Sequence, residues 1–152
     1  MKSLLFATSD HWAGLIARVT VAIVIFPHGM QKLLGSFGGY GFSGTMQFFT
    51  DTMGLPWFIG FLVIFIEFFG SLLLLIGLAG RGVAVAMAIL MLSIIVTSHS
   101  QYFFMNWFGN QSGEGFEFFL LVIGLSLIVI AAGSGRYSVD CVIARAECAS
   151  LR

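Results

Sequence analysis

Four uninterrupted apolar stretches constrain this chain more than any other feature. They cover residues 12–34, 56–78, 82–99 and 114–132. A helix needs about 20 apolar residues to cross the hydrocarbon core of a bilayer. None of the stretches shows the alternating pattern of a membrane barrel strand. We therefore predict an all-α membrane protein whose single domain, residues 1–152, is a bundle of four transmembrane helices.

The composition agrees with this class. Hydrophobic residues make up 59% of the chain and charged residues 9%, whereas about a quarter of the residues in soluble domains are charged. The formal net charge of zero gives no basic or acidic surface that would indicate a nucleic-acid partner. A cleaved signal peptide is not expected, because the first apolar stretch is too long and contains Arg18.

Two connections, residues 35–55 and 101–113, are rich in glycine and aromatic residues. Aromatic side chains favour the headgroup region, so we expect both connections to lie at one membrane surface. The first should contain a short interfacial helix capped by Ser43 or Thr45. In the tail, residues 133–152, Ser138 or Asp140 should cap a short surface helix.

The basic residues predict the orientation. Lys32 alone lies toward the side of the two aromatic connections, while the opposite side carries Lys2, Arg81, Arg136, Arg145 and Arg152. Positive charges favour the cytoplasmic side. We therefore expect both termini and the tail helix in the cytoplasm.

Arg18 and Glu67 lie inside the first and second stretches. A charge at the bilayer centre costs roughly 2.5–3.5 kcal/mol on insertion scales, so each needs a partner inside the bundle. The simplest arrangement is an Arg18–Glu67 ion pair. Such a pair can either fix the helix register or relay protons.

A second polar group is expected near the extracytoplasmic surface. His28 and Lys32 are one turn apart on the first helix, His99 ends the third, and Glu114 and Glu117 begin the fourth. The topology brings these residues to one membrane level.

Three ligands fit such a layer. The histidines and the lysine can donate hydrogen bonds to the carbonyls of a quinone and exchange protons with it. His28, His99 and Glu117 could also ligate a metal, although Lys32 would repel the cation. A haem between the two histidines lacks a recognisable motif. We therefore expect a quinone at His28, Lys32, His99 and Glu117, and neither a metal nor a haem.

Cys141 and Cys148 both lie in the tail, on the opposite side of the membrane from this layer. A thiol oxidoreductase that acts at the outer face would need cysteines there. We expect two reduced thiols.

Several motifs together resemble the DoxX family of small bacterial four-helix membrane proteins. They are Arg18, His28-Gly29, Lys32-Leu33, Glu67, Gly70, Gly77, Arg81, His99, Glu117 and the closing sequence from Gly133 to Asp140, GSGRYSVD. The resemblance implies a bacterial inner-membrane location. In several family members it also implies an association with thiosulfate- or sulfide-linked quinone reduction, or with assemblies that handle oxidative and thiol stress.

The resulting hypothesis is a membrane subunit that supports quinone-linked electron transfer. His28, Lys32, His99 and Glu117 would line the headgroup site, and Arg18 and Glu67 would hold the polar interior or relay protons. The chief alternative is a non-catalytic accessory or assembly subunit packed against a larger complex through small residues such as Ala84 and Ala88. A solute carrier is less consistent with the sequence, because no pair of spans is broken by Gly or Pro.

Overall fold

The computed structural model describes residue 8, residues 12–99 and residues 101–150; the side chains of 98–99 and 145–150 lie outside this description. Three of the expected spans appear as long helices. The first is α2 (Trp12–Leu34); the second joins α4 (Trp57–Phe65), a π-helical turn (Ile66–Gly70) and α5 (Ser71–Ile76); the third is α6 (Gly80–Ile94), which continues as a π-helical turn (Ile95–His99). The all-α class is confirmed for the described residues.

Among the described residues, three helices are long and apolar enough to cross a membrane: Trp12–Leu34, Trp57–Ile76 and Gly80–Thr97. The fourth apolar stretch forms α7 (Glu117–Ala132), which is shorter, at 16 residues. It begins three residues later than expected because the preceding segment is tied to the connection before it. The amides of Phe116 and Glu117 donate to the carbonyls of Tyr102 and Phe103.

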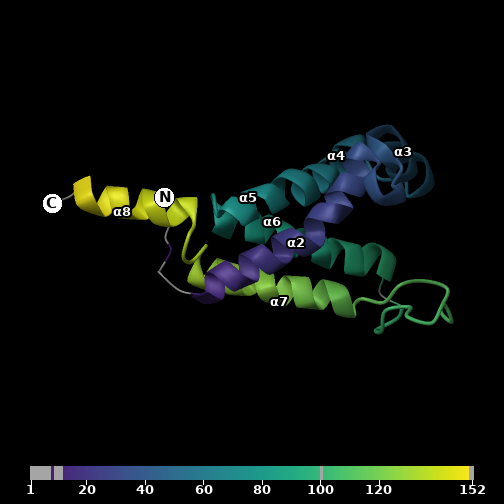
Figure 1. The fold of residues 1–152 in the computed structure, drawn as a ribbon. Helices are drawn as coiled ribbons and strands as arrows, with labels where there is room; N and C mark the ends of the chain where they lie inside the picture. The colour runs from purple at the N-terminus through teal and green to yellow at the C-terminus, as the bar shows by residue number, and fades with distance from the viewer. Residues whose placement is uncertain (1–7, 9–11, 100, 151–152) are drawn as a thin grey trace.

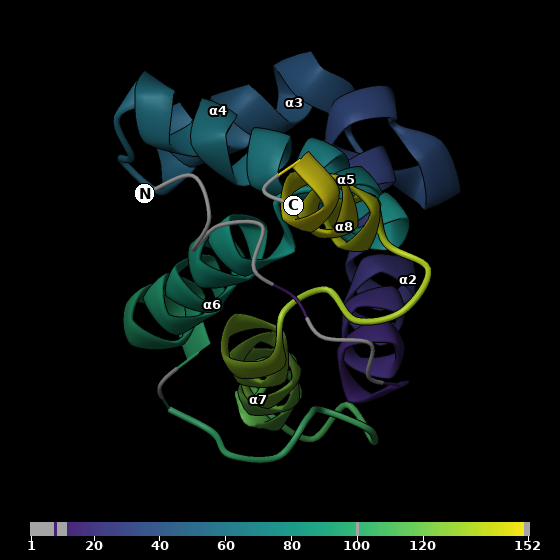
Figure 2. The ribbon, with the colours of Figure 1, turned by 90° about the vertical axis from the view of Figure 1, so that its left-hand side faces the viewer.

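The helices run alongside one another, with α2 between α5 and α7 and with α6 against α7 (Figures 1 and 2). Both aromatic connections lie at one end of the bundle, and the start of α2 and helix α8 (Val139–Ser150) lie at the other (Figure 1). The core is made by apolar side chains such as Ala17, Val21, Ile25, Leu74, Ala84, Met87 and Val129. Ala84, named above as a possible contact to a larger complex, therefore packs inside this chain.

The second span diverges from α6 and α7 toward the end of the bundle that carries the aromatic connections (Figure 1). Gly29 of α2 lies against the backbone of the π-helical turn, where a Cβ would come within 2.7 Å of Phe68 Cα. Pro27, two residues earlier in α2, removes a helical hydrogen bond. Both irregularities lie at the level where α4 leaves the bundle, which opens space between the helices.

The first connection folds into a 3-10 turn (Ser36–Gly38), helix α3 (Gly41–Gln47) and a π-helical turn (Phe48–Thr52). The expected short helix is present, but it begins at Gly41. Ser43 and Thr45 therefore lie inside it, and the capping prediction for them was wrong. The tail helix α8 begins at Val139, and Ser138 caps it by accepting a hydrogen bond from the Cys141 amide at 3.1 Å.

Candidate functional site

Two separate polar groups lie inside the bundle, one near each end. The group at the terminal end surrounds Arg18, which is only 1% exposed. Its guanidinium donates five hydrogen bonds of 2.5–3.2 Å, and the described acceptors are the carbonyls of Leu74, Leu75, Ser134, Arg136 and Tyr137. Leu74 and Leu75 belong to the last turn of α5, where a cation is favourable; the Leu74 carbonyl also accepts from the Gly77 amide. Arg18 thus fastens α2 to the end of α5 and to the segment after α7.

The predicted Arg18–Glu67 ion pair was wrong. The two helices are antiparallel, and the contact of Gly29 with Glu67 and Phe68 fixes their register. Arg18 precedes Gly29 by eleven positions, which is about 16 Å along a helix. An arginine side chain cannot cover that distance, so Arg18 binds the carbonyls at its own level.

Asp140 completes the terminal group, whereas its position in the sequence predicted only a cap of the tail helix. Its carboxylate accepts hydrogen bonds from the amides of Ala79 and Gly80 at 2.8 and 2.9 Å and from the Ser134 hydroxyl at 2.5 Å. It therefore caps the N-terminus of α6 from a distant part of the chain. The motif itself was the only signal in the sequence, because the burial of Ser134 and Asp140 is visible only in the structure.

The second polar group contains an ion pair between Lys32 and Glu67. The Lys32 Nζ lies 2.5 Å from Glu67 Oε2, and the side chains are 27% and 4% exposed. Lys32 comes from the last turn of α2 and Glu67 from the π-helical turn. Single π-helical turns often occur at functional sites, because the extra residue turns a side chain inward. Glu67 thus has a cationic partner, supplied by Lys32 instead of Arg18.

This ion pair lines a cavity of about 510 Å³, called the larger cavity below, in the space where α4 diverges. Thirteen of its nineteen lining residues are hydrophobic, including Ile25, Val63, Met91, Phe118 and Phe119. The polar ones are His28, Lys32, Glu67, Ser93, Thr97 and Glu114. The volume and the few polar groups are typical of small-molecule sites.

The other candidate residues divide into three cases. His28 faces the larger cavity, with its ring 6.2 Å from that of Phe118. Glu117 is directed into the second aromatic connection, where Oε1 accepts from the Met105 amide at 2.9 Å and from Trp107 Nε1 at 3.3 Å. His99 ends the π-helical turn after α6, and its side chain lies outside the described part. The structure therefore brings together His28, Lys32 and Glu67, and places Arg18 and Glu117 elsewhere.

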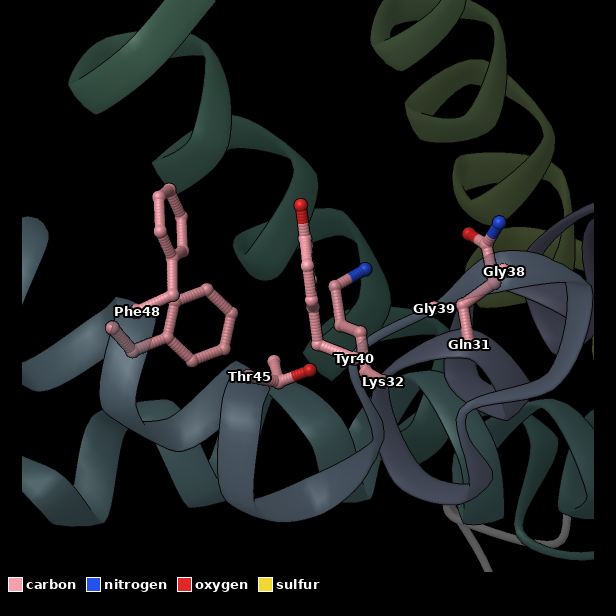
Figure 3. A pocket seen from close by; sticks show the side chains of 8 residues that line it. Gln31, Lys32, Gly38, Gly39, Tyr40, Thr45 and Phe48 are labelled. Atoms are coloured by element: carbon pink, nitrogen blue, oxygen red, sulfur yellow. The ribbon is translucent and has the colours of Figure 1, made fainter.

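A smaller cavity of about 280 Å³ lies beneath the first connection. Its lining includes Gln31, Lys32, Tyr40 and Thr45 (Figure 3). Lys32, Phe48 and Phe49 line both cavities. Lys32 is therefore placed at the boundary between a largely apolar space and a more polar one.

The charged residues that indicated orientation and the two cysteines are described only in part. Arg81 donates to the carbonyl of Ala131 at 3.2 Å, and the Arg136 guanidinium lies 5.1 Å from the centre of the Trp12 ring. Cys141 is a buried free thiol. The remaining residues of these predictions lie outside the described part of the chain, either wholly or in their side chains: Lys2, Arg145, Cys148 and Arg152.

Comparison with known proteins gives a consistent picture. A family model described as DoxX matches residues 13–100. The protein named "Putative oxidoreductase CatD" from Bacillus subtilis (strain 168) is 34% identical over 113 residues, which cover 74% of this chain and 75% of that protein. "Inner membrane protein YqjF" from Escherichia coli (strain K12) is 31% identical over 126 residues, which cover 83% and 88%. No solved structure matches significantly.

Proposed function

The chain belongs to the DoxX family of membrane proteins, and from this premise we propose that it is the membrane subunit of a quinone-linked oxidoreductase system. The observation that carries the proposal is the larger cavity, about 510 Å³, with the Lys32–Glu67 ion pair and His28 on otherwise apolar walls. The name of the Bacillus relative as an oxidoreductase supports the redox assignment.

The residues of the larger cavity fit a quinone headgroup. Ile25, Met91 and Phe118 supply apolar surface for the ring. The Lys32 ammonium and the His28 imidazole can donate hydrogen bonds to carbonyl oxygens. A quinone supplies the chemistry of a carrier of two electrons and two protons. The protein holds the headgroup, orients it against the ion pair, and keeps a proton at Lys32 Nζ.

Glu67 holds Lys32 in place, because its almost fully buried carboxylate accepts a hydrogen bond from the Lys32 ammonium. We place Glu117 outside the headgroup site, where it orders the connection that covers the cavity. Arg18 closes the opposite end of the bundle. His99 belongs to the helix turn next to the cavity, and Thr97 of the same turn lines it.

We further propose that α7 is a fourth transmembrane helix, so that the bundle spans the bacterial inner membrane four times. The apolar residues of α7, such as Leu121 and Leu127, are exposed, as expected for a surface in lipid. The two aromatic connections would lie on the extracytoplasmic side, and both termini with α8 on the cytoplasmic side. Trp107 and Phe108, 77% and 86% exposed, would anchor the bundle in the headgroup region.

Quinone content tests the proposal directly. The protein is purified in a mild detergent, and co-purified quinone is measured by mass spectrometry per mole of protein. We expect bound quinone in the native protein and at least a fivefold loss in Lys32→Ala and His28→Ala. Lys2→Ala removes the other lysine of the chain and serves as the matched control.

The opposite result would be a native protein that contains no quinone and takes none up when quinone is added. Size measurement of the same gently solubilised sample then tests the accessory role. A large stoichiometric partner without bound quinone would favour an assembly subunit that has no site of its own.

A further inference from the structure

Lys32 has access to two different environments. On one side it lines the larger cavity together with its partner Glu67, and on the other it lines the smaller cavity beneath the first connection. Phe48 and Phe49, which line both cavities, form the rest of the boundary. The polar link between the two spaces is therefore the Lys32 side chain.

The smaller cavity is suited to hold water. Thr45 is only 6% exposed, and its hydroxyl makes no hydrogen bond with any part of the chain that the structure describes. A hydroxyl that lines a cavity and has no protein partner normally binds water. A volume of about 280 Å³ accommodates several waters at about 30 Å³ each. Figure 3 shows the Thr45 hydroxyl directed toward the side chains of Lys32 and Tyr40.

The mouth of the smaller cavity is open to the surface. Tyr40, one of its lining residues, is 84% exposed, and the neighbouring Gly38 is exposed as well. The larger cavity offers a poorer route for water, since its walls are mainly apolar and Glu67 is only 3% exposed. The smaller cavity is therefore the more polar of the two routes from the surface to the ion pair.

We propose that the smaller cavity is the aqueous proton inlet of the Lys32–Glu67 ion pair. In this step the Lys32 ammonium gives one proton to an acceptor oxygen in the larger cavity. The resulting amine takes one proton from water in the smaller cavity, and the hydroxide formed leaves to the aqueous phase through the mouth beside Tyr40. No electron moves in the step. The titratable groups that share the two cavities with Lys32 are His28, Glu67, Tyr40 and Glu114 among the described side chains.

The identity of the acceptor oxygen rests on the proposed function, in which it belongs to a quinone. Access of water to Lys32 through the smaller cavity can be tested without quinone. Lys32 is one of two lysines in the chain, with Lys2, so its modification is easily assigned by mass spectrometry. The full chain in lipid nanodiscs is treated with isethionyl acetimidate, a water-soluble amine reagent that does not enter lipid. Ethyl acetimidate, which does enter lipid, is used in parallel. A free lysine-containing peptide added to each sample reports how much reagent has reacted.

Two variants change the inlet in opposite directions. Thr45→Leu fills the smaller cavity and should lower modification of Lys32 by the water-soluble reagent at least fivefold. Tyr40→Ala shortens an exposed side chain at the mouth and should raise the rate at least twofold. Because Tyr40 is exposed, we expect Tyr40→Ala to fold. If Thr45→Leu does not fold, the modification rate of Tyr40→Ala alone tests the inlet.

Modification of Lys32 by ethyl acetimidate alone, or equal rates in the native chain and the folded variants, would overturn the inlet. If the water-soluble reagent does not reach Lys32 through the smaller cavity but the protein still contains quinone, only this inference is rejected. Modification through the smaller cavity in a protein that binds no quinone rejects the proposed acceptor and leaves the inlet in place.

Discussion

The Lys32 ammonium lies 2.5 Å from the Glu67 carboxylate and joins the end of α2 to the π-helical turn of the second span. Gly29, one turn before Lys32, permits this pairing because the helix backbones meet there. The ion pair therefore depends on a local close approach of two helices as well as on charge.

Breaking the ion pair on one side should be more harmful than removing both charges. Lys32→Met leaves a buried carboxylate without its cation, and we expect a loss of about 2 kcal/mol in the free energy of unfolding. This is below the 3–5 kcal/mol typical of fully buried pairs, because Lys32 is partly exposed. The double variant Lys32→Met with Glu67→Leu should recover most of the loss. Thermal unfolding in mild detergent measures both, and additive losses would contradict the coupling.

Gly29→Ala should separate the two helices. The added methyl group would meet the backbone of Glu67 and Phe68 at 2.7–2.8 Å, and overpacking of this kind costs about 1–3 kcal/mol. We expect lower thermal stability together with reduced quinone content. Gly124→Ala on α7 is the matched control, because a Cβ there meets nothing within 4 Å. A Gly29→Ala protein as stable as the control would show that the helices do not approach so closely.

Arg18 should be the most sensitive position at the terminal end of the bundle. Arg18→Met leaves five carbonyl acceptors without their donor, and we expect a loss of more than about 3 kcal/mol. Arg18→Lys keeps the charge but not the fork of donors, so its loss should be intermediate. Folded yield by fluorescence-detected size exclusion provides the measurement. Arg81→Met, which removes a hydrogen bond to the Ala131 carbonyl, should lose less; equal losses would refute the central role of Arg18.

Asp140 should stabilise α6 from outside that helix. Asp140→Ala removes the acceptor for the amides of Ala79 and Gly80, and we expect a loss of about 1–2 kcal/mol, as for other helix caps. Asp51→Ala is a suitable control, because Asp51 is exposed and accepts from the neighbouring Thr50 hydroxyl. Hydrogen exchange at the start of α6 should rise in the first variant only. Unchanged exchange there would disprove the cap.

The sequence alone predicts the helical class well because each span is a continuous apolar run. It also selects His28, Lys32 and Glu67 as candidate residues, since polar groups inside spans need partners, but it assigned Glu67 to Arg18 and not to the group of His28 and Lys32. The pairing itself depends on the register between α2 and the second span. That register is fixed by the contact of Gly29 with Phe68, and hydropathy contains no information about it.

Other features depend on tertiary structure in the same way. The π-helical turn around Glu67 leaves no mark in the apolar pattern, because the residues on both sides are equally hydrophobic. Glu117 satisfies backbone and indole donors of the connection before it, which spacing on a helix could not indicate. Asp140 reaches back across some sixty positions to α6.

The bonds of Arg18 also have a consequence for biosynthesis. Three of its five acceptors belong to residues 134–137, which leave the ribosome more than a hundred residues after Arg18 itself. Until then the first span carries a cation in the membrane with only the end of the second span to bind it. The hydrogen bonds around Arg18 are therefore completed only after residues 134–137 have been made. In a nascent chain stalled before residue 134, Arg18 of the first helix lacks three of its five acceptors.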